Sequence, residues 1–555
     1  MTELLVVMVL AFVVIAGATV VGPRLGIASP LVLVAIGVAA SFLPAFSSTH
    51  IEPELILEGV LPPLLYSSAV SMPAMNFRRE FGAISGLSVI LVIGSALLLG
   101  LFFMLAIPGL GFAWGVALGA IVSPTDAVAT SIIKQTSVSR RVVAILDGES
   151  LLNDATALVL LRTAILATAA SFSVWGAVGR FSYSVVVAVL IGGLVGVLNL
   201  VVRTRVTDPT VNTVISFTVP FLASVPAGLL GASGLVAAVV AGLVTGVRAP
   251  RDLSPQNRLS DAQNWRTVEL VLEGAVFLTM GVQIKSIVTN VEQDGGGVAT
   301  AVLVAVGALV LTILVRAGYV APLLRYLRAR ARHGERMQAM LQDMQGRMTT
   351  PEGRQDAFQQ INPRRRKVSE RRLDSFTQRV TQGLATIDYF LREPLGWREG
   401  TAVVWAGMRG AVTVAAAQTL PDDTPQRSVL VLVAFAVAAL SLLVQGGTTG
   451  PLLTRISPAV DQAAVDGRTQ AEVTRIFELM RTSGESVPEP EHAEVATPDG
   501  FAVAKAHRLA VIAAQRSALL DARDNGTFDS DVLAGALANL DASQIAIEMR
   551  GTLAV

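Results

Sequence analysis

Cysteine is absent from this sequence, and charged residues are scarce. None of the 555 residues is a cysteine, which excludes disulfide bonds and thiolate metal sites. Only 15% of the residues are charged, whereas a soluble chain carries roughly 25%. The deficit falls in long apolar runs, and a helix needs about 20 such residues to cross a bilayer. The composition predicts an all-α polytopic membrane protein, and the net charge of +1 gives no reason to expect a nucleic-acid partner.

Thirteen apolar runs are candidate membrane spans. They lie near 4–22, 30–44, 53–72, 81–107, 111–134, 142–169, 174–203, 210–229, 231–248, 265–290, 297–326, 399–420 and 427–455. Lys and Arg concentrate in the odd-numbered gaps between these runs. Because cytoplasmic loops collect Lys and Arg, the alternation predicts an external N-terminus and a cytoplasmic C-terminus. No basic region precedes the first run, so we expect a membrane helix there rather than a cleaved signal.

Two polar segments lie outside these runs. Residues 327–398 are rich in arginine and include "NPRRRKVSERR", which predicts a solvated cytoplasmic insertion, with contact to anionic lipid as the alternative. Residues 457–555 contain helical spacing in "GFAVAKAHRLAVIAAQRSALLDARDNG" and no nucleotide-binding or metal-binding motif. The sequence thus predicts a membrane domain over 1–456 and a small helical cytoplasmic tail over 457–555.

The sixth run contains "GESLLNDATALVL", in which polar residues interrupt an apolar helix. A charged side chain at mid-bilayer costs at least about 2.5–3.5 kcal/mol, so it needs a partner, water or a function. Ser150 and Asp154 are four apart and share a helix face, where they offer two oxygen ligands to a small cation. Glu149 and Asn153 share the adjacent face. The alternative is that Asp154 pairs with an arginine such as Arg162.

The fifth and twelfth runs are both interrupted. In "IVSPTDAVAT", Pro124 breaks the helix, and Thr125 and Asp126 are placed to cap a new half-helix; the alternative is a simple proline kink with Asp126 as a plain N-cap. In "WAGMRGAVTVAAA", Arg409 lies mid-span between Gly407 and Gly410 and requires an anion. A broken helix is tolerated in lipid only where it lines a cavity or is buried in protein. The two runs cross in opposite directions, as an inverted-repeat transporter requires.

The tenth run carries two acidic residues in "VELVLEGAVFLTMGVQ". Glu269 and Glu273 are four residues apart and share one helix face. We expect them to contact water near the cytoplasmic end, with an ion path as the alternative.

Taken together, "LPPLLY" (residues 61–66), "SPTDAVA", "GESLLNDATALV" and "GMRGAV" resemble the monovalent cation/proton antiporters of the sodium/proton exchanger type. The resemblance covers roughly 1–456. It implies thirteen helices with inverted repeats and two crossed discontinuous helices, and a homodimer without cofactors. It further implies a secondary transporter, not an enzyme. Such a protein would exchange Na⁺, or alternatively K⁺ or Li⁺, for H⁺ across the plasma membrane in pH homeostasis.

The resemblance also assigns roles within the site. Asp154 would be the carboxylate that exchanges cation and proton, and Asn153 marks the electroneutral branch. Oxygen atoms of Ser150, Thr125 (through its backbone) and Asp126 would surround the Na⁺ or K⁺ ion. Since burial disfavours the charged carboxylate, proton and cation would compete for it, and only a loaded site would cross.

Two further assignments concern charge. Glu149 and Arg409 would form an ion pair that braces the core. Relatives often have a glutamate directly after "LPPLLY", where this chain has Ser67, so one negative charge is lost. Glu58 or Glu273 could compensate.

Other classes of protein fit less well. An intramembrane aspartyl protease would need a GxGD motif and a metalloprotease HExxH, and both are absent. A cation channel would need no competing protonatable ligand. A transport-inactive sensor with its output in the tail is the other alternative. None of the four histidines lies mid-span, so a pH set-point is expected from carboxylates.

Overall fold

The computed structural model describes most of the chain. The described residues are 2–24, 28–43, 52–126, 128–134, 136, 138–169, 174–295, 297–348, 350, 353–355, 358, 370–456, 462–490 and 498–550. They form two compact units, of which the first comprises Met1–Asp252, Leu259–Leu323 and Gly396–Pro458. The second comprises Leu253–Arg258, Leu324–Leu395 and Ala459–Val555.

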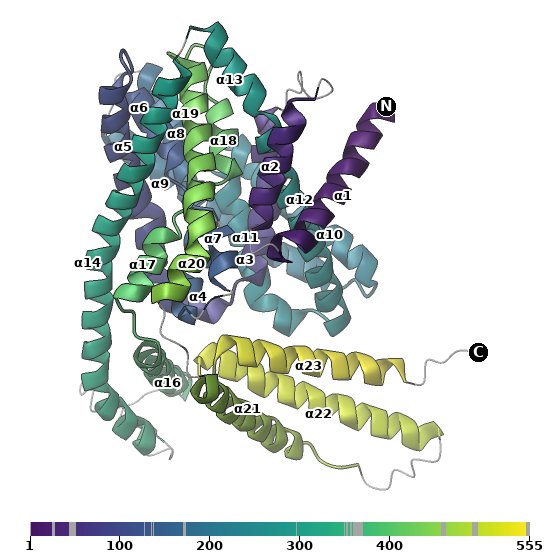
Figure 1. The fold of residues 1–555 in the computed structure, drawn as a ribbon. Coiled ribbons are helices and arrows are strands. Elements are labelled where there is room, and N and C mark those ends of the chain that lie inside the picture. Colours follow the sequence, from purple (N-terminus) through teal and green to yellow (C-terminus); the bar gives the residue numbers. More distant parts are fainter. Residues whose placement is uncertain are drawn as a thin grey trace. The chain divides into compact units, whose positions relative to one another are not determined.

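The first unit is a bundle of apolar helices (Figure 1). Its elements, some of them π-helical turns (η), are α1 (Thr2–Arg24), α2 (Ser29–Ser41), η2 (Leu55–Val60), α3 (Leu61–Ser71), α4 (Ala74–Ser85), η3 (Gly86–Leu91), α5 (Val92–Ala106), α6 (Phe112–Val122), α7 (Val128–Ile133), α8 (Arg140–Ala169), α9 (Val174–Arg203), α10 (Pro209–Leu229), α11 (Gly234–Asp252), α12 (Pro255–Val282), α13 (Ile284–Gln293), α14 (Val298–Arg347), α17 (Trp397–Trp405), α18 (Ala411–Gln418), α19 (Arg427–Ser441), η4 (Leu442–Gly446) and α20 (Gly447–Ile456). The first turn of α12 and the end of α14 belong to the second unit.

The predicted all-α class is confirmed for the described residues, in which every regular element is a helix. Nine helical segments among them are long and apolar enough to cross a bilayer. Shorter apolar helices occur at Ser29–Ser41, Leu55–Ser71 and Phe112–Val122. The count of thirteen, the inverted repeats and the crossing of the broken helices stay predictions.

Glycine lets α6 approach α5 closely. A Cβ atom on Gly115 would lie 2.4 Å from the carbonyl oxygen of Gly100, and one on Gly119 would lie 2.4 Å from that of Ala96. Only glycine fits at such a distance between backbones. The contact buries α6 and fixes the first half of the broken fifth span.

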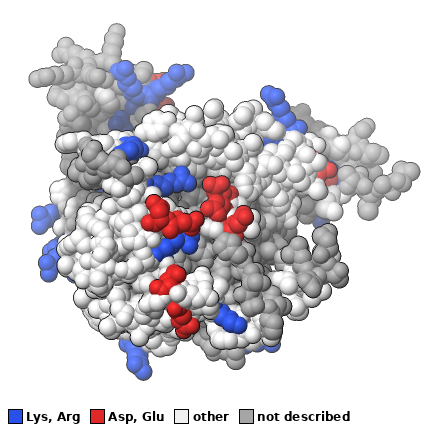
Figure 2. Space-filling view, turned by 90° about the horizontal axis from the view of Figure 1, so that it is seen from above, with Lys and Arg blue, Asp and Glu red and all other residues white. Residues whose placement is uncertain are grey.

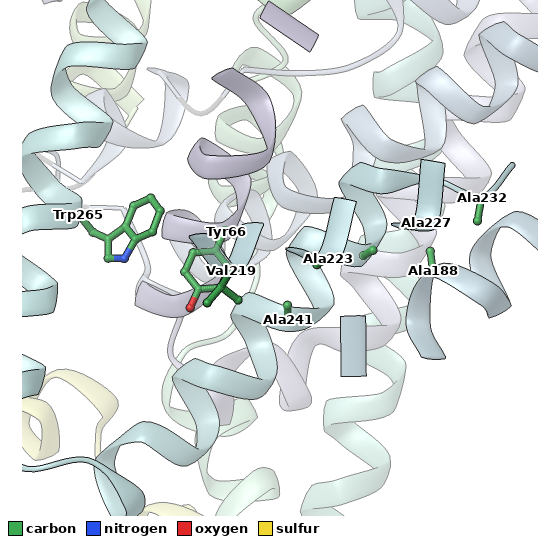
Figure 3. Close-up of a cluster of buried hydrophobic side chains, with 9 residues drawn as sticks. Tyr66, Ala188, Val219, Ala223, Ala227, Ala232, Ala241 and Trp265 are labelled. Atoms are coloured by element: carbon green, nitrogen blue, oxygen red, sulfur yellow. The ribbon is translucent and has the colours of Figure 1, made fainter. Parts of the chain in front are cut away.

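An alanine-rich core fixes α3 (Figure 3). Alanines of α9, α10 and α11 pack there with Tyr66 of α3 and Trp265 of α12. The two aromatic rings have centroids 5.1 Å apart, and the Tyr66 hydroxyl lies 3.4 Å from the Thr245 hydroxyl. Small side chains let these helices approach closely, which is how helices associate in a membrane. Tyr66 directly precedes Ser67, so this core positions a predicted site residue.

The second unit consists of amphipathic helices. The end of α14 packs on α16 (Glu370–Arg392) through a cluster that includes Met344, Phe376 and Leu384. The other elements are α21 (Gln462–Glu485), α22 (Pro498–Asn525) and α23 (Ser530–Met549), which share a core around Leu519. The helical spacing predicted for 500–526 corresponds to α22.

Acidic side chains are visible near the middle of one end of the molecule. Figure 2 views that end from above and shows them beside a few basic side chains, on an otherwise uncharged surface.

Candidate ion-binding site

Two helices of the first unit are interrupted, and their interruptions touch. Pro124 lies in the break between α6 and α7, where it lacks an N–H donor and disfavours helix at the residue before it. The break between α17 and α18, residues 406–410, contains Gly407, Met408 and Gly410. The backbone N–H of Asp126 donates to the carbonyl oxygen of Met408 at 2.8 Å. This hydrogen bond joins the two breaks directly.

Arg409 stabilises the contact between the breaks. Its Nε donates to the carbonyl of Val122 at 2.9 Å, and its two Nη atoms donate to the carbonyls of Ser123 and Gly407. The first two carbonyls lie at the C-terminal end of α6, where a helix has unpaired carbonyl groups and a partial negative charge. The side chain is fully buried. Backbone carbonyls therefore replace water around this cation.

The prediction that Glu149 pairs with Arg409 was wrong, because another arginine takes that position. Arg316 of α14 donates to both oxygens of Glu149, from Nη1 at 2.5 Å and from Nη2 at 2.7 Å. Its Nε donates to the carbonyl of Val403 at 2.8 Å, and Thr125 Oγ1 donates to Glu149 at 3.2 Å. A bidentate guanidinium leaves no need for a second cation. The brace thus joins α8, α14 and α17 to the α6–α7 break.

The role of Arg316 was not predicted from the sequence. It lies within the predicted span 297–326, in "LVRAGYV", and was assigned no role there. It could have been noticed in the same way as Arg409, because an arginine in the middle of a membrane-spanning helix usually pairs with an anion or with backbone carbonyls.

Asn153 ties α8 to the α6–α7 break. Its Nδ2 donates to the hydroxyl of Thr125 at 2.7 Å and to the Thr125 carbonyl at 3.1 Å. Its Oδ1 is buried and accepts no hydrogen bond from any described residue. The Asn153 side chain therefore holds Thr125 in place and keeps one oxygen available.

Asp154 has no neutralising partner within the described part of the chain. No described N–H or O–H group donates to its carboxylate, and Arg162 is exposed and forms no ion pair with it. The charged group that acts on it is another carboxylate, Asp126. Ser150, four residues earlier, donates its hydroxyl to the Asp147 carbonyl at 3.1 Å, which leaves the hydroxyl oxygen able to accept or to ligate.

Asp126 lies at the centre of the arrangement. Its Oδ1 accepts from the N–H of Val128 at 3.0 Å, which caps α7 as the sequence suggested. A Cβ atom on Gly410 would lie 1.3 Å from Asp126 Oδ2, so only glycine admits the carboxylate here. Asp126 interacts electrostatically with both Asp154 and Glu273. Three carboxylates therefore share one electrostatic neighbourhood.

Ser67 of α3 contacts α12. Its hydroxyl donates to Glu269 Oε2 at 3.2 Å. Glu269 also interacts with Lys134 and with Asp147, which form an ion pair at 3.1 Å. Both the Ser67–Glu269 contact and the Lys134–Asp147 pair were missed from the sequence, because they join helices distant in the chain.

The possible ligands around the break are oxygen atoms of several kinds. No group of three or more His, Cys, Asp or Glu side chains that could hold a metal ion occurs among the described residues. Asp154, Ser150, Asn153 and Thr125 offer carboxylate, hydroxyl, amide and backbone carbonyl oxygens. Hard cations bind oxygen ligands of these kinds.

Comparison with known proteins places the chain in a family. The model of the transmembrane sodium/hydrogen exchanger family matches residues 8–350 and 376–455. An uncharacterized Na⁺/H⁺ exchanger of Mycobacterium tuberculosis is 28% identical over 483 residues, which are 85% of this chain and 78% of that protein. The Na⁺/H⁺ antiporter ApNhaP of Aphanothece halophytica is 24% identical over 448 residues, 80% of this chain and 72% of that protein.

A solved structure shows the same fold. The sodium proton antiporter MjNhaP1 of Methanocaldococcus jannaschii superposes with a TM-score of 0.54 at 14% identity, covering 82% of this chain and 99% of that one. The fold and the broken-helix site define a membrane transporter of the antiporter type. The chain belongs to the sodium/hydrogen exchanger family, whose members are secondary transporters and not enzymes.

Proposed function

We propose that the protein exchanges Na⁺ for H⁺ one for one, by competition of the two ions for the carboxylate of Asp154. The observation that carries the proposal is the isolation of this carboxylate. The neighbouring Glu149 is neutralised by Arg316, whereas Asp154 has no cationic partner among the described residues. A buried carboxylate in that situation must bind a proton, a cation or water.

The proposed ion would be held by oxygen atoms near the break. Asp154 supplies the charge, Ser150 a hydroxyl, Thr125 its backbone carbonyl, and Asp126 a carboxylate oxygen directly or through water. Asn153 contributes by fixing Thr125 through two hydrogen bonds. Because Asn153 is neutral, Asp154 remains the carboxylate of α8 at this position.

Coupling follows from the cost of moving an empty site. A charged side chain in the middle of the membrane costs at least about 2.5–3.5 kcal/mol, which disfavours the empty ionised form by roughly two orders of magnitude. With a proton or a monovalent cation bound, Asp154 is neutralised. Since either ion removes one unit of charge, exchange of one for the other moves no net charge.

We also propose a location, a topology and an oligomeric state. We place the membrane domain (1–456) in the plasma membrane, with the N-terminus outside and the tail (457–555) in the cytoplasm, on the distribution of Lys and Arg. A homodimer is proposed by family resemblance. Ions would reach Asp154 from one side at a time.

The test is exchange in proteoliposomes with an internal pH indicator. Purified wild type should show Na⁺-driven proton efflux, and Asp154→Asn should abolish it while keeping the thermal unfolding midpoint. Asp422→Asn is the matched control, since Asp422 is fully exposed in the turn before α19 and should leave transport unchanged. K⁺ and Li⁺ are compared over a range of pH.

Two outcomes would overturn the proposal. Exchange retained in Asp154→Asn would remove the assigned carboxylate. Wild-type flux that needs no opposing proton gradient and follows an imposed voltage would indicate a channel instead.

A further inference from the structure

The end of α19 makes direct contacts with the α17–α18 break. The Ser441 hydroxyl is fully buried and accepts a hydrogen bond from the backbone N–H of Arg409 at 2.9 Å. As a donor, the same hydroxyl lies 3.2 Å from the carbonyl oxygen of Arg409 and 3.0 Å from that of Ala438. One side chain thus contacts both backbone polar groups of a residue inside the break.

A second contact comes from the π-helical turn that follows α19. Gln445 of η4 donates from Nε2 to the carbonyl oxygen of Trp405, the last residue of α17, at 3.1 Å. A Cβ atom on Gly446 would lie 3.3 Å from Met408 Sδ, so the same turn packs against the break. Single π-helical turns within helices are frequent at functional sites. Ser441 and Gln445 therefore hold the break on either side of Met408.

These two side chains complete the hydrogen bonding of the break. An interrupted helix loses its own donors, and each buried carbonyl then needs another one. Every carbonyl from residue 402 to residue 410 accepts a hydrogen bond. The donors are backbone N–H groups, including that of Asp126, and the side chains of Arg316, Arg409, Ser441 and Gln445.

The α17–α18 break is in turn bonded to the candidate ion site. The Met408 carbonyl accepts from the backbone N–H of Asp126 at 2.8 Å, and the Arg409 side chain donates to the carbonyl of Val122 at 2.9 Å. Asp126 and the adjacent Thr125 are the proposed ligands from the α6–α7 break. A shift of Met408 and Arg409 would therefore shift these ligands as well.

We propose that Ser441 and Gln445 are positioning residues, which set the cation affinity of the ion site by holding the α17–α18 break against the α6–α7 break. This inference rests on the proposed antiport function and adds two residues to it. A cation binds several oxygen atoms at once, so its affinity depends on their relative positions. A proton binds to a single carboxylate oxygen. A loosened break should therefore weaken the binding of the cation and leave that of the proton unchanged.

The test is the KM for Na⁺ in proteoliposomes, measured at several pH values. Ser441→Ala removes the hydroxyl, and Gln445→Met removes the amide at similar volume. Each variant should raise the KM about fivefold, the change that corresponds to one hydrogen bond of about 1 kcal/mol, and leave the maximal rate within about twofold. Because the proton affinity is unchanged, the KM should rise by the same factor at every pH.

Thermal unfolding separates positioning from a general loss of stability. Gln445→Met removes the hydrogen bond to Trp405, but it also removes a buried Oε1 atom that has no donor among the described residues. Because a buried polar atom without a partner is destabilising, the two effects oppose each other. The unfolding midpoint of Gln445→Met should stay close to that of wild type although its KM rises.

Ser41→Ala is the matched control. Ser41 of α2 is also fully buried, and its hydroxyl donates to the carbonyl of Val38, three residues earlier, at 2.7 Å. Ser441 makes the same kind of bond to Ala438. The Ser41 hydroxyl forms no other hydrogen bond with the described part of the chain, so its removal should leave the KM unchanged.

Several outcomes would overturn the inference and leave the proposed function standing. One is a wild-type KM in both Ser441→Ala and Gln445→Met, and another is a fall in the maximal rate alone. An equal rise of the KM in Ser41→Ala would show a general effect of losing a buried hydroxyl. A rise that varies with pH would place the effect on the protonation of Asp154. If the wild type shows no exchange, the proposed function itself has failed.

Discussion

Glu149 of α8 and Arg316 of α14 form a buried bidentate ion pair, with nitrogen–oxygen distances of 2.5 and 2.7 Å. Because the Arg316 side chain also donates to the carbonyl of Val403, one guanidinium joins three helices. The arrangement separates two carboxylates that are five residues apart on the same helix. Glu149 is neutralised by Arg316, whereas Asp154 has no cationic partner among the described residues, which is what its proposed role requires.

The pair predicts a loss of stability when either partner is removed alone. Arg316→Met leaves a buried carboxylate without its cation, and Glu149→Gln leaves a buried guanidinium, each of which commonly costs about 3–5 kcal/mol. Thermal unfolding in detergent should show a lower midpoint for each variant. The double variant should lose less than the sum, because no charge is then unpaired. Wild-type midpoints in both single variants would contradict the assignment.

Gly410 predicts a steric effect on the site itself. A Cβ atom at this position would lie 1.3 Å from Asp126 Oδ2, so Gly410→Ala must displace the carboxylate from the break. We expect proteoliposome exchange to fall by at least about tenfold, since a misplacement near 1 Å can cost 10²-fold in a positioned site. Gly447→Ala is the control, because nothing lies within 4 Å of a Cβ atom there. Full activity in Gly410→Ala would show that the carboxylate can move without consequence.

Some features of this site could be predicted from the sequence, and others could not. The helix breaks were predictable because their causes are local: Pro124 removes a backbone donor, and glycines flank Arg409. The partner of Glu149 was not predictable, because several arginines, including Arg316 and Arg409, lie in apolar runs and spacing alone does not show which one faces α8. Arg409 donates instead to the backbone carbonyls at the C-terminal end of α6, and only the packed structure shows this.

Helix lengths show the same limit. The predicted span 297–326 corresponds to α14, which continues to Arg347 because polar residues sustain a helix beyond the apolar run. The predicted span 265–290 corresponds to α12, which begins earlier at Pro255, followed by α13. Hydropathy marks the part of a helix that can lie in lipid, and it leaves the ends of the helix open.

Asp208 predicts a pH dependence outside the membrane-spanning segments. The backbone N–H groups of Val211 and Thr210 donate to Asp208, at 3.1 and 2.7 Å, and lower the pKa of its carboxyl. Because the folded pKa lies below the unfolded value of about 3.9, the charged cap contributes stability above that pH. That contribution is lost as the pH falls through the folded pKa. Asp208→Ala should therefore lower the unfolding midpoint at pH about 7 and differ less from wild type at pH about 3.

The control for this pH effect is Asp208→Asn. An amide oxygen can still accept the two hydrogen bonds, but it has no charge to lose in acid. The difference in unfolding midpoint between Asp208→Asn and wild type should therefore follow only the titration of the Asp208 carboxylate. A difference in unfolding midpoint between wild type and Asp208→Ala that is the same at pH about 3 and pH about 7 would show that the charge of Asp208 does not stabilise the helix.

Arg203 and Asp261 form another buried ion pair, at 3.0 Å. Arg203 also donates to Asn212 at 2.7 Å and to Ser216 at 3.3 Å, and Trp265 donates to the same serine at 2.9 Å. The pair therefore joins α9, α10 and α12 beside the alanine-rich core.

Arg203→Met leaves the buried Asp261 carboxylate without its cation. We expect the free energy of unfolding to fall by about 3–5 kcal/mol and the unfolding midpoint to fall with it. The double variant Arg203→Met with Asp261→Leu removes both charges, and we expect it to recover most of the loss, because replacing a buried pair with apolar groups is often neutral. The KM for Na⁺ in the recovered variant should equal that of wild type, since neither residue lies at the carboxylates near the α6–α7 break. A changed KM with restored stability would instead connect this pair to ion binding.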